Sequence, residues 1–199
     1  MAGRRIEAAL LVVLTSSFHN SSRADEKVKA VVVIIRTELG DIEVELETGK
    51  APATVANFLR YVDGKFYDSG RFHRTVKSDN QPDNKIKIEV VQAGINPAKK
   101  DEFAPLKLER TRDTGLKHKA GTISMARDGP DTATSDCFVC LGDQPELDFG
   151  GKRNPDGQGF AAFGRVVRGM DVVRKIQAAP ADGQALTPPV KILKMTRRP

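Results

Sequence analysis

The apolar and polar residues of the chain follow two kinds of pattern, one typical of strands and one typical of helices. The strand pattern covers most of the chain. Residues 31–35 form an unbroken β-branched run, which is typical of a buried strand. After a turn at Leu39-Gly40, residues 41–47 alternate polar and apolar side chains, as in a strand with one solvated face. Further strand-like segments follow, separated by loops rich in Gly, Pro, Asp and Asn: residues 71–76, 86–91, 121–126, 135–141, 161–167 and 190–196.

Two segments have helical spacing instead. The first follows Pro52, which is favoured in a first helical turn, and ends at Gly64, with Thr54 as a candidate N-cap. The second spans residues 170–177. Many strands with only two helices favour a closed or sandwich-like β fold, in one domain without internal repeats. The spacing predicts that the inward-facing residues are Val55, Phe58, Leu59 and Val62 in the first helix, and Met170, Val173 and Ile176 in the second.

The N-terminus has the features of a targeting segment. An arginine pair gives it a positive start, and the apolar run over residues 8–14 is too short to span a bilayer as a helix. A small-x-small cleavage sequence ends at Ala24. We therefore predict a signal peptide over residues 1–24 and a periplasmic or secreted domain over residues 25–199, with no stable membrane insertion after processing. The alternative is a cytoplasmic protein that keeps the N-terminal segment as an extension.

The charge of the chain argues against a nucleic-acid partner. The formal net charge is +6, but acidic residues are interleaved with basic ones along the whole sequence. A nucleic-acid-binding protein more often gathers its positive charge on one element. We interpret the basicity as an aid to solubility and as a weak attraction to anionic surfaces.

The two cysteines, Cys137 and Cys140, have the spacing of a redox dithiol, but their surroundings predict a strand. Residues i and i+3 on a strand lie roughly 10 Å apart and face opposite ways. This separation exceeds the reach of a disulfide. We expect two half-buried free thiols.

Common catalytic templates are missing. The sequence has three histidines, at positions 19, 73 and 118, without the paired spacing of a zinc site. It also lacks a Gly-x-Ser-x-Gly elbow and a phosphate-binding glycine loop. The sequence therefore predicts neither a metal nor a cofactor.

A series of short segments occurs in a fixed order from Val28 onward: Phe72-His73-Arg74, Val91-Gln92-Ala93-Gly94, residues 121–126, Gly129-Pro130 with Thr132, residues 135–138, Phe163-Gly164-Arg165-Val166 and Gly169-Met170. Each segment is weak alone, but their order and spacing together are specific. Together they resemble the cyclophilin family of peptidyl-prolyl cis-trans isomerases, and its exported bacterial members in particular.

The resemblance implies a closed eight-stranded antiparallel β-barrel capped by two α-helices, with a substrate groove on the outside of one face. It also implies a monomer that needs no cofactor and acts on proline-containing unfolded or flexible protein segments. The expected activity is peptidyl-prolyl isomerisation that assists the folding of exported proteins.

An arginine can catalyse this reaction without a nucleophile, a metal or a proton transfer. The X-Pro bond rotates over a barrier of about 18–20 kcal/mol because the amide is conjugated. In the twisted transition state the prolyl nitrogen becomes pyramidal and gains a lone pair. A fixed, permanently charged donor near this nitrogen stabilises the twisted state more than either planar state.

The family's functional positions fall on named residues of this chain. Arg74 matches the catalytic arginine, and Gln92 matches the glutamine that binds substrate backbone and steadies the arginine. The main chain of Arg127 matches the position that holds the residue before proline. The remaining matches concern the apolar pocket: Phe138 as its floor, Leu147 as a wall, and Phe160, Val90 and Ala126 around it.

Several departures from the family pattern weaken the predicted pocket. Glu89 stands three residues before Gln92, where the family has a phenylalanine, and Asp136 stands where it has a glutamine. The lost aromatic area corresponds to about 1–3 kcal/mol of binding. Residues 77–85 form a polar insertion between two strands, which we expect to be a solvated hairpin tip or to cover or extend the groove. Two alternatives to an active isomerase therefore stay open: a cyclophilin-fold binding or chaperone module with little turnover, and an unrelated β-barrel.

Overall fold

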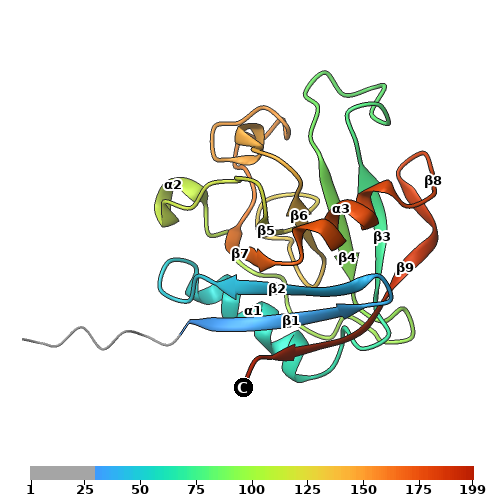
Figure 1. The fold of residues 1–199 in the computed structure, drawn as a ribbon. Coiled ribbons are helices and arrows are strands. Elements are labelled where there is room, and N and C mark those ends of the chain that lie inside the picture. Colours follow the sequence, from blue (N-terminus) through green and yellow to red (C-terminus); the bar gives the residue numbers. More distant parts are fainter. Residues whose placement is uncertain (1–29) are drawn as a thin grey trace, which may run out of the picture.

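The computed structural model describes residues 30–199, so the predicted signal peptide lies outside the described residues. The described part forms a closed antiparallel β-barrel (Figure 1). Neighbouring strands pair in the order β1-β2-β7-β5-β6-β4-β3-β9, and β1 also pairs with β9, which closes the ring. The eight barrel strands are β1 (Val31–Thr37), β2 (Gly40–Leu46), β3 (Arg71–Val76), β4 (Val90–Gly94), β5 (Thr122–Met125), β6 (Cys137–Cys140), β7 (Ala162–Arg168) and β9 (Ala185–Arg197).

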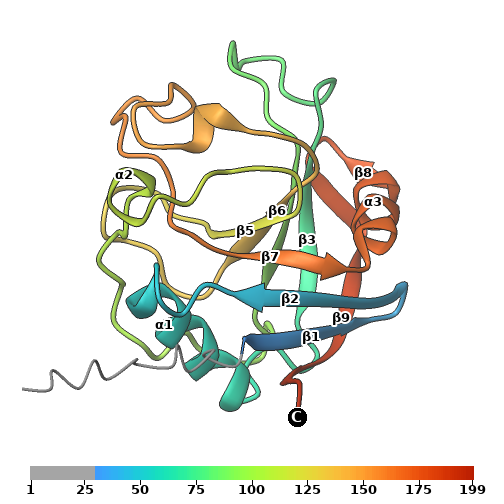
Figure 2. The ribbon, with the colours of Figure 1, turned by 60° about the vertical axis from the view of Figure 1, so that its left-hand side comes forward.

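Two helices cap this barrel, as the resemblance implied. Helix α1 (Pro52–Asp63) lies at the lower left of the barrel in Figure 2, and α3 (Met170–Ala178) lies at its right. The predicted inward residues of both helices are buried, except Met170, which is half-buried. The sequence patterns missed three short elements: α2 (Thr111–Thr114), the 3-10 turn η1 (Pro145–Leu147) and β8 (Ala181–Asp182), which pairs with one end of β9.

The barrel interior is filled with side chains rather than hollow. Phe58 from α1 packs against Phe163 of β7 with ring centroids 5.1 Å apart, and against Tyr67 at 5.6 Å. Phe72 of β3 belongs to the same buried cluster. Full burial of such a side chain contributes about 1.5–3 kcal/mol, so the helix caps and the strands stabilise one another through this core.

The first helix is capped by a distant side chain and not by Thr54. The N-cap position is Ala51, which makes no side-chain capping bond. Glu109 instead accepts hydrogen bonds from the backbone N–H of Ala53 at 3.2 Å, from the backbone N–H of Thr54 at 2.7 Å and from the Thr54 hydroxyl at 2.6 Å. A carboxylate suits this end of a helix because its first N–H groups lack partners within the helix. The prediction of Thr54 as the N-cap was wrong because the cap lies 55 residues away in sequence.

The predicted strand over residues 86–91 is displaced, since β4 spans Val90–Gly94. Ahead of it, the amide of Gln81 takes the place of a neighbouring strand for Ile88. Its Nε2 donates to the Ile88 carbonyl at 2.8 Å, and its Oε1 accepts from the Ile88 N–H at 3.3 Å. Ile88 therefore satisfies its backbone groups through a side chain, which no periodicity reveals.

A bulge in β3 decides where Arg74 points. Strand geometry places residues i and i+2 on the same face. The pairing register of β3 shifts between Phe72 and Arg74, so His73 is an extra residue there. Phe72 consequently lies in the barrel core, whereas Val76, on the same face as Arg74, belongs to a separate cluster outside it. The bulge thus turns Arg74 to the outer face of the barrel.

The strand interpretation of the cysteine pair is confirmed. Cys137 and Cys140 are free and lie on β6, with Cys137 in the barrel core and Cys140 in the outer cluster. Both are fully buried rather than half-buried, because each faces one of two packed layers. Burial raises the pKa of both thiols.

None of the helices in residues 30–199 is long and apolar enough to cross a membrane.

Candidate active site

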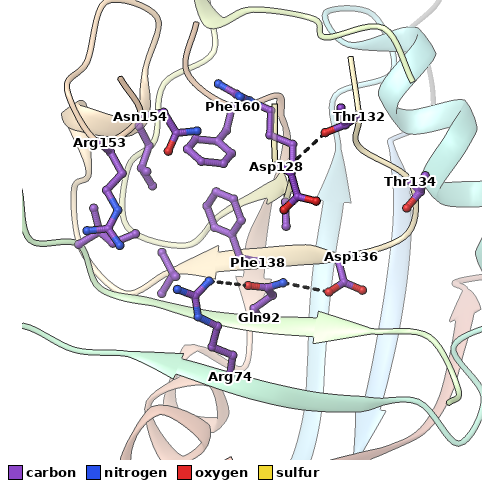
Figure 3. Close-up of a pocket in the computed structure, with 15 residues that line it drawn as sticks. Arg74, Gln92, Asp128, Thr132, Thr134, Asp136, Phe138, Arg153, Asn154 and Phe160 are labelled. Carbon is purple, nitrogen blue, oxygen red and sulfur yellow. Dashed lines mark hydrogen bonds between the residues drawn. The ribbon is translucent and has the colours of Figure 1, made fainter. Parts of the chain in front are cut away.

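A groove of about 360 Å³ lies on the outer face of the barrel, over β3, β4 and β6 (Figure 3). The residues that line it come from distant parts of the sequence. Every predicted site residue except Glu89 is among them: Arg74, Val90, Gln92, Ala126, Arg127, Asp136, Phe138, Leu147 and Phe160.

Strand alternation explains why Glu89 does not line this groove. Val91 and Ala93 of β4 point into the barrel core, so Val90 and Gln92 point outward. Ile88, two residues before Val90, continues the outward set and lines the groove. Ile88, and not the predicted Glu89, therefore lines the groove at this point.

Two glutamines hold the guanidinium of Arg74. Gln184 Oε1 accepts hydrogen bonds from Arg74 Nε at 2.9 Å and from Nη2 at 2.6 Å. Gln92 Oε1 accepts from Arg74 Nη1 at 3.1 Å. A guanidinium has five N–H donors, so one hydrogen on each terminal nitrogen remains for a substrate. The arrangement fixes the side chain without neutralising its charge.

The glutamine beside Arg74 is itself oriented by a carboxylate. Gln92 Nε2 donates to Asp136 Oδ2 at 2.9 Å, which leaves the Gln92 carbonyl oxygen facing Arg74 (Figure 3). His73 Nε2 lies 3.5 Å from the same Asp136 oxygen. Asp136 therefore acts on Arg74 through Gln92, and no ion pair joins Asp136 directly to Arg74.

The groove has an apolar floor beside the arginine. Phe138 packs edge-on against Phe160, with ring centroids 5.4 Å apart. Leu147 is fully buried next to it, and Val90 and Ile88 complete the cluster. A proline ring is compact and apolar, so this pocket matches its shape and chemistry.

Behind the floor lies a buried Ser-His-Asp arrangement. The His118 ring stacks on Phe138 with centroids 6.1 Å apart. Its Nδ1 lies 2.8 Å from Asp148 Oδ1 and its Nε2 lies 3.0 Å from Ser124 Oγ. The spacing resembles a hydrolytic triad, but Ser124 is 0% exposed, so no substrate reaches its hydroxyl. The trio supports Phe138 from behind.

A long loop between η1 and β7 forms the opposite rim of the groove. Arg127 anchors it: the guanidinium binds both oxygens of Asp156, at 2.7 and 2.9 Å, and donates to the Gly159 carbonyl at 2.8 Å. The same guanidinium lies 4.9 Å from the centroid of the Phe160 ring. The side chain of Arg127 thus binds the loop, and Arg127 is also one of the residues that line the groove.

The insertion over residues 77–85 is anchored at its base and exposed at its tip. Gln81 is 1% exposed, and Asn80 donates to the carbonyls of Thr75 and Gly183, each at 3.0 Å. Gln184 Nε2 in turn donates to the Asn80 carbonyl at 3.0 Å. None of residues 77–85 lines the groove. The insertion therefore supports Gln184, and through it Arg74, rather than covering the groove.

Sequence reasoning did not assign seven residues to this site: Ile88, Asp128, Thr132, Thr134, Arg153, Asn154 and Gln184. Counting back from Gln92 by the strand period would have found Ile88. Arg153 and Asn154 lie in a glycine-rich loop and Gln184 follows a tight turn at Gly183, where only the folded chain shows which side chain faces inward.

Burial affects the titration of the charged groups here. It lowers the pKa of Arg74 and of Arg153, and the nearby charge of Arg74 lowers the pKa of Arg153 further. Burial also lowers the pKa of His73, an effect that the Asp136 carboxylate partly opposes. The two arginines stay protonated at working pH, since arginine does not deprotonate in proteins.

Comparison with known proteins places this barrel and groove in a family. The model of the cyclophilin type peptidyl-prolyl cis-trans isomerase/CLD family matches residues 32–197. Peptidyl-prolyl cis-trans isomerase A of Dickeya dadantii is 36% identical over 174 residues, which cover 87% of this chain and 84% of that protein. Peptidyl-prolyl cis-trans isomerase B of Escherichia coli is 34% identical, with 73% of this chain and 84% of that protein covered.

The solved structures agree on the fold. A cyclophilin type isomerase of Cryptosporidium parvum superposes with a TM-score of 0.68 at 21% identity, covering 85% of this chain and 98% of that one. The chain belongs to the cyclophilin-type peptidyl-prolyl cis-trans isomerase family, and it is an isomerase. An unrelated β-barrel is excluded, because Arg74, Gln92 and Phe138 lie in one groove.

Proposed function

We propose that Arg74 accelerates rotation about X-Pro bonds in protein segments bound along the groove. The observation that carries the proposal is the position of its guanidinium. It is held by Gln184 and Gln92 at the edge of the apolar pocket of Phe138, with hydrogens left over for a substrate.

Substrate binding starts with the proline ring. The ring enters the pocket over Phe138, between Leu147 and Phe160, where burial of its apolar surface favours binding. The main chain of Arg127 holds the residue before proline. Gln92, oriented by Asp136, supports both Arg74 and the substrate backbone.

Arg74 acts on the twisted state. As the X-Pro bond rotates, conjugation is lost and the prolyl nitrogen gains a lone pair that accepts a hydrogen bond from the guanidinium. No covalent bond forms or breaks, and no proton is transferred. The hydrogen bond is strong in the twisted state and weak in either planar state, so it lowers the barrier. Positioning by the glutamines means that the protein does not reorganise during rotation.

Proline-containing segments are the proposed partners. The related Cryptosporidium parvum protein was solved in the presence of the dipeptide Ala-Pro, which supports this class of ligand. The protein binds such segments as a monomer, on a groove open to solvent, so that a loop of a larger protein can enter.

The proposed clients are exported proteins, and the chain reaches them after removal of residues 1–24. The support is the sequence pattern of the N-terminus, with its arginine pair, short apolar run and small-x-small site. N-terminal sequencing of protein recovered from cell fractions tests this directly. A chain that starts at Asp25 outside the cytoplasm agrees with export, whereas an intact N-terminus in the cytoplasm contradicts it.

A second candidate is a binding module with little turnover. It is favoured by the small aromatic content of the groove, where the aromatic lining residues are Phe138 and Phe160. Such a module would bind proline peptides, but Arg74 would not accelerate the isomerisation of their X-Pro bonds.

Isomerase activity on short X-Pro peptides separates the two candidates. We expect the wild-type chain to act well above the uncatalysed rate, and Arg74→Ala to lose about a hundredfold or more in kcat/KM. Arg71→Ala is the matched control, because Arg71 is exposed on the same strand and does not line the groove. Background rates in all three proteins would favour the binding module.

A further inference from the structure

The groove carries opposite charges at its two ends. Figure 3 shows Arg74 and Arg153 on one side of Phe138, and Asp128 and Asp136 on the other. A protein segment that lies along the groove therefore meets a positive end and a negative end on either side of its proline.

The positive end has no carboxylate of its own. Within residues 30–199, neither Arg74 nor Arg153 forms an ion pair. Neutral groups hold both side chains: Arg153 Nη1 donates to Gln81 Oε1 at 2.8 Å and to the Ile86 carbonyl at 2.7 Å. Two like charges thus share a half-buried site, and the charge of Arg74 lowers the pKa of Arg153. Such a site favours an anion, because a carboxylate would relieve their repulsion.

A third arginine on the groove shows the contrast. Arg127 binds both oxygens of Asp156, so its charge is compensated within the protein. Arg153 sits in the same loop as Asp156 yet has no such partner among the described ion pairs. Its Nε and Nη2 make no hydrogen bond in the described part of the chain and remain as a fork that matches a carboxylate.

We propose that Arg153 binds the side-chain carboxylate of the residue that follows the isomerised proline, so that the preferred clients contain X-Pro-Asp or X-Pro-Glu. The direction of the chain rests on the proposed function, in which the main chain of Arg127 holds the residue before proline. Arg127 is adjacent to Asp128, at the negative end (Figure 3). The segment therefore leaves the Phe138 pocket toward Arg153. The negative end adds to this preference by favouring a basic residue two positions before the proline.

A pair of peptides with the same composition tests the proposal. Lys-Ala-Pro-Glu and Glu-Ala-Pro-Lys, each acetylated and amidated, have equal net charge and no charged termini. We expect kcat/KM to be about tenfold higher for the first, since favourable contacts at both ends become repulsive in the second. Raising the salt from about 0.05 M to about 0.5 M should reduce this ratio, because the ends are open to solvent.

Variants identify the residue responsible. In Arg153→Gln the positive end of the groove is weakened and the negative end is unchanged. The ratio of the two kcat/KM values should therefore fall to about threefold. Arg153→Lys, which keeps the charge but not the fork, should retain an intermediate ratio. Lys152→Gln is the matched control, because it removes the same charge from the same loop at an exposed position outside the groove lining, and it should leave the ratio unchanged. Thermal unfolding of each variant verifies that it is folded.

The outcomes separate this proposal from the proposed function. Equal rates for the two charged peptides, a preference for Glu-Ala-Pro-Lys, or an unchanged ratio in folded Arg153→Gln would each overturn the role of Arg153. In those cases turnover of the neutral peptide Gln-Ala-Pro-Gln would leave the proposed function standing. Turnover of no peptide would overturn both.

Discussion

The floor and the rim of the groove are built in different ways. The floor consists of strands β3, β4 and β6, which place Arg74, Gln92 and Phe138 through regular pairing and one bulge. The rim consists of the loop around residues 149–160, which Arg127 holds, and of the insertion before β4, which Gln81 holds and which supports the groove without lining it. The difference suggests a division of labour, in which the floor carries the chemistry and the rim chooses the client.

The first way to test this contrast is to remove an aromatic ring from each part. Phe138 on the floor is 5% exposed, so Phe138→Ala should lower the free energy of unfolding by about 3 kcal/mol or more. Phe160 on the rim is only half-buried, and Phe160→Ala should cost about 1 kcal/mol. Urea unfolding measures both. Equal costs would mean that the rim is as firmly packed as the floor.

The second test removes the support behind the floor. Burial alone would raise the pKa of Asp148, but hydrogen bonds from the His118 ring and backbone N–H outweigh it, with help from Lys117, and lower this pKa. The ionised carboxylate thus stabilises the fold above the unfolded pKa of about 3.9, and this contribution is lost as the pH falls through the lower folded pKa.

Asp148→Asn should therefore lower the free energy of unfolding by about 1–3 kcal/mol at neutral pH. This gap, the difference in free energy of unfolding between wild type and variant, should become smaller toward pH 3. Urea unfolding over a pH series measures this gap. A gap that is constant across the series would show that ionisation of Asp148 does not contribute.

The third test breaks the link between rim and floor. Gln184→Leu removes the acceptor of two Arg74 hydrogen bonds and should lower kcat about tenfold, with little change in KM, because the guanidinium loses its fixed position. Gln184→Glu keeps an acceptor and should retain more activity. Asp182→Asn, an exposed neighbour, is the control. A rise in KM alone would assign Gln184 to substrate binding instead.

The smallest expected effect concerns the rigidity of β6. Burial raises the pKa of Cys137 and Cys140, and thiolates are the reactive form. Both thiols should therefore resist a thiol reagent in the folded protein and react promptly in denaturant. Rapid labelling of Cys140 in the folded state would mean that the floor opens toward the groove.

The same contrast separates what the sequence predicts from what it does not. The strands, both capping helices, and the floor residues Arg74, Gln92 and Phe138 follow from periodicity together with the resemblance to the family. Periodicity works here because each strand packs one face against the barrel core and turns the other outward, and in β3, β4 and β6 the outward face lies under the groove.

The rim resisted prediction because side chains, and not backbone periodicity, shape it. Gln81 replaces a strand partner for Ile88, so the strand begins later than the sequence pattern predicts. Glu109 caps a helix from 55 residues away. Arg153 and Gln184 reach the groove only through loop conformations that the chain acquires on folding.

The central claim is that Arg74 stabilises the twisted X-Pro bond rather than the bound peptide. Line-shape analysis of an Ala-Pro peptide by NMR gives its Kd and the rate of exchange on the protein separately, for wild type and for Arg74→Ala. We predict that the on-protein rate falls about a hundredfold in the variant while Kd changes by less than about threefold. An unchanged on-protein rate with a weakened Kd would contradict the account, because Arg74 would then serve binding alone.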